Sequence, residues 1–242
     1  MDLEGDDIAA RFKASFDDAG IVAARFEIID AAAQCFDTTA DYLQTAGWVL
    51  RDDVNLATAL LARLAGRLTA GIATLLRLSN AYAAAALLRQ LIEVEYLAFV
   101  GYINDEELKR WYRAEPEELR KQFTPKRMRD ASGGLFRDAE YSLHCEVGGH
   151  PHPRARMLLP AYSPPFPPEG FLLPDCVHHV HRLWISFRST LERRDTEKSL
   201  LLRCGSRLDT AIASWKDIED EAILAFDGIG LAHDAPNDDG EH

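Results

Sequence analysis

The chain has 242 residues, of which 47% are apolar and 27% charged, and its formal net charge at pH 7 is −12. This length and composition are typical of one globular domain with a sizeable core, and they exclude an intrinsically disordered chain. The acidic balance argues against a general nucleic-acid binder, because such proteins neutralise phosphates with basic side chains.

The charge is unevenly distributed along the chain. Residues 1–53 and residues 216–242 each carry a net charge of −8, so the residues between them carry +4. The acidic ends indicate solvated surface that keeps the protein soluble. The basic middle is strongest over residues 119–137 and leaves a localised RNA contact open.

Alanine and leucine dominate the sequence, β-branched residues are sparse, and no run alternates apolar and polar residues. These features predict an all-α protein, a helical bundle around a central antiparallel helical hairpin over residues 54–79 and 80–102, with a long Pro-rich loop. We expect a single domain over residues 1–231. Its parts are acidic N-terminal helices (1–53), core helices (54–149), the Pro-rich loop (150–174) and C-terminal helices (175–231), followed by an acidic disordered tail (232–242).

The first predicted helices precede the hairpin. Apolar residues at helical spacing predict a short helix over residues 5–18, which Gly20 ends, and a second helix over residues 21–48. A polar stretch at residues 37–39 either interrupts the second helix or caps a new one.

Two N-cap positions mark the hairpin itself. Asp52 or Asp53 can accept hydrogen bonds from the free N–H groups of the helix that follows, and Asn80 can do the same for the central helix. The link between the two helices is short, which favours antiparallel neighbours.

The central helix, Ala81 to Tyr102, is apolar on nearly every side but contains Arg89, Glu93 and Glu95. Each of these charges would cost about 2.5 to 3.5 kcal/mol in a bilayer, so the helix is not a membrane span. Arg89 and Glu93 lie one turn apart on one face, and we expect them to pair inside the core. The pair is either part of a binding pocket or a clamp between helices.

Beyond the hairpin the sequence predicts shorter elements. Asn104 and Pro116 start two short helices, and the break at residues 132–134 precedes a helix over residues 135–147. Residues 150–174 hold eight of the eleven prolines, so they are predicted to form neither a regular helix nor a central strand. Their apolar side chains indicate packing across the helices, over the polar pair or against a second subunit.

Asp175 is the expected cap of a helix that runs to Arg194, and a last helix spans residues 207–227. His178 and His181 lie at positions i and i+3 of the first of these helices. They could form a zinc site with Cys176, His144, Cys145, His150 or His152. No pairing matches a known zinc-ligand spacing, so neither a metal nor any other cofactor is predicted.

A polar segment lies directly before the Pro-rich loop. It carries Tyr141, Ser142, His144, Glu146, His150 and His152. Histidine titrates near neutrality and can act as an acid, a base or a ligand. Together with the central pair, this segment suggests a polar pocket whose binding residues are Arg89, Glu93, Tyr141, Ser142 and His150.

The four cysteines, Cys35, Cys145, Cys176 and Cys204, lie far apart, and the N-terminus lacks the pattern of a secretory signal. These features predict reduced thiols in a cytoplasmic protein. The sequence contains no P-loop, GxGxxG, GxSxG or HExxH motif, so nucleotide-binding, hydrolase and zincin functions have no motif support.

Two elements of the sequence carry a family resemblance. The stretch LLRQLIEVEYLAFV, with its Arg-x3-Glu pattern, is followed by Trp111, by Tyr141-Ser142-Leu143 and by His150-Pro151. Over residues 54–155 this arrangement resembles bacterial all-helical domain families of unknown function, which are similar to HEPN-type helical domains. The Pro-rich insert and the acidic ends depart from that pattern.

Many HEPN-type domains are dimeric RNases with an Arg-x4-6-His motif, and here six residues separate Arg137 from His144. The polar residue that usually follows the arginine is Asp138. The resemblance therefore implies Arg137 and His144 as catalytic residues. Arg137 would stabilise phosphate charge, and His144 would serve as base or acid.

The residues thus favour a non-catalytic binding or interaction module with a polar pocket. The alternative is a HEPN-like, metal-independent RNase or a defence- or toxin-type accessory protein. We expect a homodimer, because the apolar loop and the wide helix faces offer more apolar surface than a monomer should expose. A protein partner or a small ligand is expected, RNA is disfavoured by the acidic charge, and no membrane association is predicted.

Overall fold

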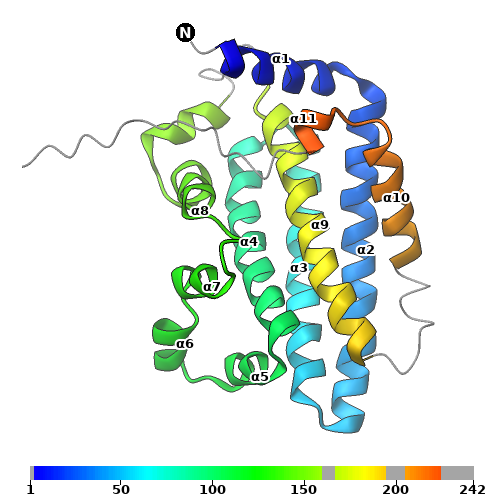
Figure 1. The fold of residues 1–242 in the computed structure, drawn as a ribbon, viewed down its shortest axis with the longest axis vertical. Helices are drawn as coiled ribbons and strands as arrows, with labels where there is room; N and C mark the ends of the chain where they lie inside the picture. Colours follow the sequence, from blue (N-terminus) through cyan, green and yellow to red (C-terminus); the bar gives the residue numbers. More distant parts are fainter. Residues whose placement is uncertain (1–2, 160–166, 195–204, 225–242) are drawn as a thin grey trace, which may run out of the picture.

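The computed structural model of the chain describes residues 3–159, 167–194 and 205–224 (Figure 1). Every regular element among these residues is a helix, which confirms the predicted all-α class. The elements are α1 (Leu3–Asp17), α2 (Ala19–Leu50), α3 (Asp53–Arg77), α4 (Ala81–Ile103), α5 (Asp105–Arg113), α6 (Pro116–Gln122), α7 (Pro125–Ala131), α8 (Asp138–His144), the π-helical turn η1 (Cys145–Gly149), the 3-10 helix η2 (Pro153–Leu158), α9 (Glu169–Arg194), α10 (Ser206–Lys216) and α11 (Glu221–Leu224).

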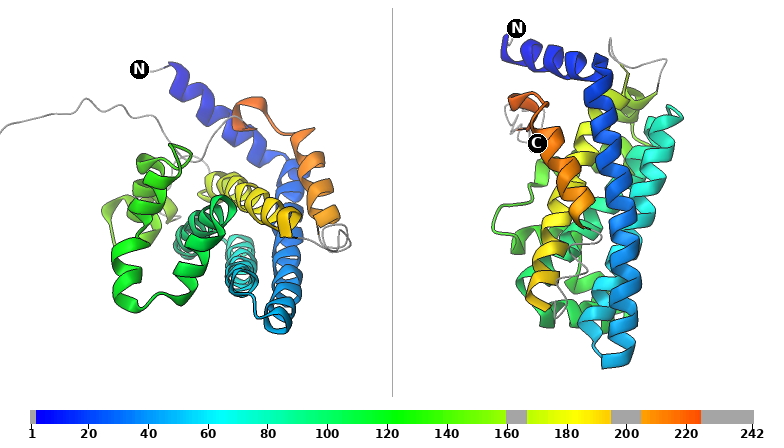
Figure 2. Two further views of the ribbon diagram at one scale, coloured as in Figure 1. Left: turned by 60° about the horizontal axis from the view of Figure 1, so that its bottom comes forward. Right: turned by 90° about the vertical axis from the view of Figure 1, so that its right-hand side faces the viewer.

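Four long helices form the centre of the molecule. Helix α2 packs against α3, α3 against α4, α4 against α9, and α9 against α2, which closes a four-helix bundle (Figures 1 and 2). Helices α3 and α4 form the antiparallel hairpin that the sequence predicts. Helices α4 and α9 run in the same direction, because α5 to α8 and η2 carry the chain back along the outer side of α4 (Figure 1).

Local capping explains where the hairpin helices begin. The Asp52 side chain accepts hydrogen bonds from the backbone N–H groups of Val54 and Asn55, at 2.9 and 3.3 Å. The Asn80 side chain accepts from the N–H of Ala83 at 3.2 Å. Both caps were expected from the residue types, and they satisfy N–H groups that a helix start leaves without an intrahelical acceptor.

The N-terminal helices differ from the expectation in two respects. The break between them lies at Asp18 and not at Gly20, because the Asp18 side chain caps α2 by accepting from the N–H groups of Gly20 and Ile21. Helix α2 also continues through residues 37–39 without interruption. Asp37 there is not a cap, because its carboxylate pairs with Arg63 of α3 at 3.0 Å.

The Pro-rich segment also differs from the expectation. Helix α9 begins at Glu169, before the expected cap Asp175, and contains Pro174 near its start. Pro174 is the sixth residue of α9, so its missing N–H removes the hydrogen bond that would reach the carbonyl of Gly170, and the helix continues past it. Residues 153–158 form the 3-10 helix η2, whereas residues 160–166 lie outside the described residues.

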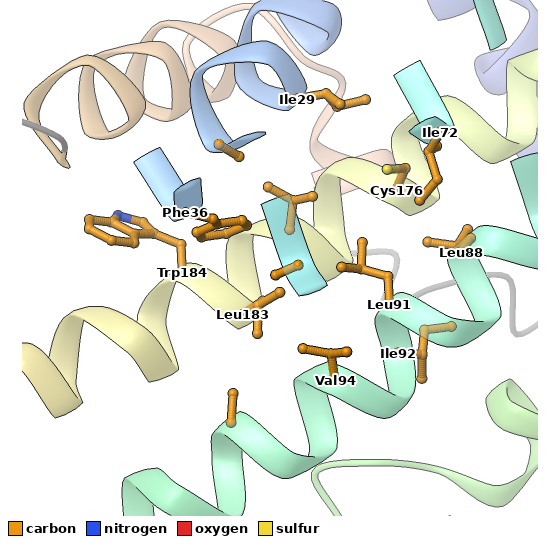
Figure 3. Close-up of a cluster of buried hydrophobic side chains, with 14 of the residues drawn as sticks. Ile29, Phe36, Ile72, Leu88, Leu91, Ile92, Val94, Cys176, Leu183 and Trp184 are labelled. Carbon is orange, nitrogen blue, oxygen red and sulfur yellow. The ribbon is translucent and has the colours of Figure 1, made fainter. Parts of the chain in front are cut away.

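Several described apolar side chains of the Pro-rich segment pack onto the helices, as predicted, whereas Leu159 is 40% exposed. Leu158, Leu172 and Leu173 are buried in the main core. Figure 3 shows part of this core, in which Phe36 of α2 lies beside Trp184 of α9. Leu91 and Ile92 of α4 approach the same cluster from the opposite side.

Among the described helices, α3 alone is long and apolar enough to cross a membrane, with a mean hydropathy of 1.4 over its most apolar stretch. Half of that stretch is buried inside the bundle, where α3 contributes to the core. A buried core helix meets the same criterion of length and composition. The expected tail, residues 232–242, and Cys204 lie outside the described residues.

Candidate functional site

Two polar clusters lie where α4, α8 and α9 meet. The first, which we call the rim cluster, comprises Arg89, Glu93, Tyr141 and Cys145. Arg89 pairs with Glu93 at 2.9 Å and donates to the Tyr141 hydroxyl at 3.1 Å, and Tyr141 donates to Glu93 at 2.8 Å. Arg89 Nε also donates to the Cys145 sulfur at 3.4 Å. The predicted pair therefore forms, and Tyr141 joins it as expected.

The rim cluster is only partly buried, in contrast to the expectation of a pair hidden in the core. The Arg89 and Glu93 side chains keep 24% and 33% of their surface exposed. Their face of α4 is turned toward α8 and η1, which cover this face only in part, whereas the opposite side of α4 packs against α3 and α9. The pair thus joins α4 to α8 at the protein surface.

Two glycines allow this close approach. A Cβ atom on Gly148 would lie 2.6 Å from the carbonyl carbon of Ala85, and one on Gly149 would lie 2.8 Å from Cδ of Arg89. Both distances are shorter than any ordinary carbon–carbon contact of about 3.5 Å. Glycine at these positions therefore lets η1 lie directly against α4.

The second cluster, which we call the core cluster, is buried beneath the first. It comprises Glu95 of α4, Glu140 and His144 of α8, and Asp175, His179 and Arg182 of α9. Apart from Arg182, which keeps 16% of its side chain exposed, every member is at most 3% exposed. Carboxylates in such surroundings require charged or hydrogen-bonded partners.

Arg182 supplies one of these partners. Its Nε atom donates to Glu95 Oε1 at 2.7 Å, and its Nη2 atom donates to Glu140 Oε1 at 2.6 Å. Burial alone would lower the pKa of Arg182, but the two carboxylates outweigh this effect and raise it. Burial raises the pKa of Glu95, and the guanidinium of Arg182 opposes that shift. The arginine thus holds two acids from different helices in place.

His179 contacts the carboxylates on both sides of its ring. Its Nδ1 atom lies 2.7 Å from Glu95 Oε2 and 2.8 Å from the Arg182 guanidinium. Arg182 Nη2 can only donate and already donates to Glu140, whereas the Glu95 carboxylate can only accept. We therefore assign Glu95 as ionised and Nδ1 as the protonated donor to Glu95, its nearer neighbour. The opposite nitrogen, Nε2, then presents its lone pair to Glu140.

The remaining histidine nitrogens have no hydrogen-bond partner among the described residues. This holds for Nε2 of His179 and for both ring nitrogens of His144. His179 Nε2 lies 3.5 Å from Glu140 and 3.6 Å from Asp175, and His144 Nε2 lies 3.5 Å from Asp175. Desolvation lowers the pKa of His144 to about 4 and that of His179 to about 3, so both rings are neutral at pH 7.

A small apolar cavity adjoins the core cluster. It has a volume of about 40 Å³, and His144 forms part of its wall. Its other lining residues are Leu143, Val147, Met157, Leu158, Phe171 and Leu172. Met157, Leu158, Phe171 and Leu172 of the Pro-rich segment therefore lie over the His144 side of the core cluster.

Three of the predicted site residues, Arg137, Ser142 and His150, belong to neither cluster. Arg137 is exposed at the N-cap of α8, whereas His144 is buried at the opposite end of that helix. Ser142 and His150 are exposed, and in the described part of the chain no hydrogen bond or ion pair joins them to the rim cluster. The structure thus brings together Arg89, Glu93 and Tyr141 of the predicted binding set.

The histidines considered for zinc are not the ones that α9 turns inward. His178 contacts the carbonyl oxygen of Ile223 at 3.0 Å, and His181 lies 3.3 Å from the Lys216 ammonium group. Both face the C-terminal helices. His179, between them, faces α4 and α8.

Glu140, Asp175, His179 and Arg182 of the core cluster are not among the predicted site residues, although the sequence contains a spacing pattern that points to some of them. An acid precedes a histidine by four residues at four places in the chain, and two of them, Glu140-x3-His144 and Asp175-x3-His179, lie in the core cluster. On a helix this spacing places both side chains on one face. Two such helices can present two carboxylates and two imidazoles to a common point.

No family model, curated protein or solved structure matches the chain. The resemblance to HEPN-type helical domains therefore stays a prediction from the residues quoted for it. What the protein does has to be argued from the geometry of the two clusters.

Proposed function

We propose that the protein is a non-catalytic binding module that holds a small ligand in the core cluster. The observation that carries this proposal is the convergence of His144 and His179 on buried carboxylates, with ring nitrogens that lack partners among the described residues. A buried polar atom without a hydrogen bond costs about 1 to 3 kcal/mol. A ligand that fills the gap between these atoms would remove that cost.

The surroundings of the core cluster limit the size of the ligand. Its members are almost completely buried, and the adjoining cavity of about 40 Å³ has room for little more than a water molecule or two. An ion or a molecule of very few atoms fits this space. A polymer or a large metabolite would require α8 to separate from α4.

The rim cluster has a supporting role in this proposal. Tyr141 lies on α8, directly after Glu140 and three residues before His144. Its hydroxyl connects α8 to Arg89 and Glu93 of α4. Burial and the hydrogen bond to Glu93 raise the pKa of Tyr141, so the phenol stays neutral and can keep donating. The rim cluster thereby fixes the helix that carries two core ligands.

Native mass spectrometry of the full chain, purified without a chelator, tests the proposal. We expect the native mass to exceed the denatured mass by the mass of a non-covalent ligand, and we expect the His144→Phe variant to lose that excess. Phenylalanine keeps the ring packing against His179, whose centroid lies 5.3 Å away. Equal native and denatured masses for the wild type, or an excess that the variant retains, would contradict it.

A metal-independent RNase is the second function that the residues suggest. It would need His144 in contact with an RNA phosphate, and only 1% of that residue is exposed. The geometry therefore lends this role no support. An RNA cleavage assay separates the two functions, because an RNase would cut RNA as the wild type and fail as His144→Ala, whereas the binding module is inactive in both forms.

We further propose that the module is a cytoplasmic homodimer. The described cysteines Cys35, Cys145 and Cys176 form no disulfide with one another, as a reducing compartment favours. Trp48, Val49 and Leu50 are 66%, 77% and 67% exposed, and Trp48 also borders a surface hollow of about 220 Å³. Such contiguous apolar surface favours association.

Sedimentation velocity at micromolar concentration tests the dimer. We expect the wild type to sediment as a dimer and the double variant Trp48→Glu, Leu50→Glu to sediment as a monomer. Wild-type protein that sediments as a monomer would exclude this part of the proposal. The apolar residues of the Pro-rich segment, by contrast, are largely used within the chain.

A further inference from the structure

We infer that the core cluster binds one divalent transition-metal ion through Glu140, His144 and His179, with Asp175 completing the coordination shell. This inference rests on the proposed function, because it names the ligand of the site proposed there. Glu140, His144 and His179 each offer one ligand atom, and these atoms lie within 4.8 Å of one another.

The distances between the donor atoms suit an ion placed between them. The contacts of His179 Nε2 with Glu140 and Asp175 measure 3.5 and 3.6 Å, and that of His144 Nε2 with Asp175 measures 3.5 Å. An N–H···O hydrogen bond would be at most about 3.2 Å long. Ligands at about 2.0 to 2.1 Å from a tetrahedral metal lie about 3.4 Å from one another. These three spacings are therefore those of ligands around a shared ion, and the other donor pairs among Glu140, His144 and His179 lie within 4.8 Å.

The carboxylate behind His179 provides independent support. A metal-bound histidine usually donates its second ring N–H to a carboxylate, which fixes the tautomer and strengthens the metal bond. Glu95 occupies this position, 2.7 Å from Nδ1 of His179, and leaves Nε2 free for a metal. Arg182 in turn fixes both Glu95 and Glu140. The outer partners of a metal site are thus already in place.

The charge of the cluster also favours a cation. Glu95 and Glu140 contribute two negative charges and Arg182 one positive charge, so these three groups leave one buried negative charge. A carboxylate away from water is costly unless a cation compensates it. A divalent ion beside the neutral histidines would provide that compensation.

The donor types narrow the choice of metal. Imidazole nitrogen with carboxylate oxygen suits zinc, iron and manganese, whereas calcium and magnesium prefer oxygen donors alone. Cys145 and Cys176 adjoin cluster members in the sequence, but Cys145 accepts from Arg89, and neither sulfur belongs to the group of donor atoms that lie within 4.8 Å of one another. The site is therefore expected to bind through nitrogen and oxygen, without sulfur.

Calorimetric titration of the full chain with ZnCl₂, after removal of metal with EDTA and dialysis, tests the inference. We expect one Zn²⁺ to bind per wild-type chain. We expect His144→Phe and Glu140→Gln to weaken that binding at least about 100-fold, because each removes a direct ligand. The matched control is His150→Ala with His152→Ala, which removes two exposed histidines near the site and should leave the affinity unchanged.

Circular dichroism and thermal melting in EDTA establish that each variant is folded. If His144→Phe does not fold, Glu140→Gln decides, because it preserves the shape of the side chain. The inference is overturned if the wild type shows no saturable Zn²⁺ binding, if the cluster variants bind as the wild type does, or if only the surface variant loses binding.

The result also separates this inference from the proposed function. A co-purified adduct that depends on His144 but contains no metal, together with no Zn²⁺ binding, would overturn the metal and leave the binding module standing. Neither an adduct nor Zn²⁺ binding would overturn both. A metal adduct that depends on His144, together with Zn²⁺ binding that depends on His144 and Glu140, would support both.

Discussion

The Nδ1 atom of His179 lies 2.7 Å from Oε2 of Glu95, and both side chains are buried in the core although 84 positions separate them in the chain. This contact fixes which nitrogen of His179 faces the other acids. It places the unprotonated nitrogen toward Glu140 and Asp175, where a ligand is proposed. The packing of α4 against α9 therefore determines which nitrogen of His179 is available to a ligand.

Replacing Glu95 by glutamine tests the role of this contact. The amide keeps the size of the side chain but removes the charge that orients His179, so we expect Zn²⁺ affinity to fall about 10- to 100-fold at unchanged stoichiometry. Titration calorimetry measures the change. Glu106→Gln, on α5 with its side chain 78% exposed, is the matched control and should bind as the wild type does. Equal affinities for Glu95→Gln and the wild type would refute the orienting role.

The buried histidines make the stability of the metal-free protein depend on pH. The folded-state pKa values of about 4 for His144 and about 3 for His179 lie below the ordinary value of 6.5. Below pH 6.5 the unfolded chain therefore binds protons that the folded chain does not bind. Stability is fully present above pH 6.5 and is lost as the pH falls toward 4, by up to about 1.4 kcal/mol per pH unit for each histidine.

Urea unfolding in EDTA at pH 7 and at pH 5 measures this loss. We expect His144→Phe to lose less stability over that interval than the wild type, because it has one titrating histidine fewer. The comparison cancels the titration of the carboxylates that both proteins share. An equal loss in the two proteins would show that His144 is not a buried neutral base.

A second buried ion pair holds the N-terminal and C-terminal helices together. Arg25 of α2 pairs with Glu219 at 2.6 Å, both side chains are completely buried, and Trp215 donates to the same carboxylate at 2.7 Å. Arg25→Met leaves Glu219 without its cation, so we expect a loss of about 3 to 5 kcal/mol in the free energy of unfolding.

An exposed pair on the same helix is the control for this prediction. Glu27 of α2 pairs with Arg207 at 2.8 Å, but the two side chains are 48% and 54% exposed. We expect Glu27→Gln to cost less than about 1 kcal/mol. Chemical denaturation measures both variants, and similar losses for Arg25→Met and Glu27→Gln would contradict the importance of burial.

The close approach of η1 to α4 yields a prediction about Gly148. Alanine at this position would place its Cβ 2.6 Å from the backbone of Ala85, so η1 has to move outward. We expect Gly148→Ala to destabilise the protein by about 1 to 3 kcal/mol and to weaken Zn²⁺ binding, because His144 directly precedes η1. Ser142→Ala, an exposed change on α8, should alter neither quantity. Wild-type stability and binding in Gly148→Ala would show that η1 can shift freely.

Features set by neighbouring residues could be predicted from the sequence. The caps Asp52 and Asn80 depend on hydrogen bonds within three residues, and the pair of Arg89 with Glu93 depends on one helical turn. The helical class and the α3–α4 hairpin follow from the same local patterns. Tyr141 was grouped with this pair because polar residues are dense around it.

The core cluster could not be predicted in the same way. Whether His178, His179 or His181 faces inward depends on how α9 packs against α4 and α8, and that packing follows a long crossover through α5 to α8. The early start of α9 cannot be recognised from the sequence, because Pro167, Pro168 and Pro174 near the start of that helix resemble prolines in a loop. The sequence contains the acid-x3-His spacing at Glu140-x3-His144 and Asp175-x3-His179, but only the fold shows that these two segments lie side by side.

X-ray absorption at the zinc edge of the Zn²⁺-loaded protein tests whether His144 and His179 bind the ion. We expect a first shell of nitrogen and oxygen at about 2.0 to 2.1 Å, with the outer-shell scattering of two imidazole rings. His144→Phe should reduce that scattering to one ring. A sulfur contribution at about 2.3 Å, or a zinc environment without imidazole, would contradict this binding, because the ion would then be bound outside the core cluster.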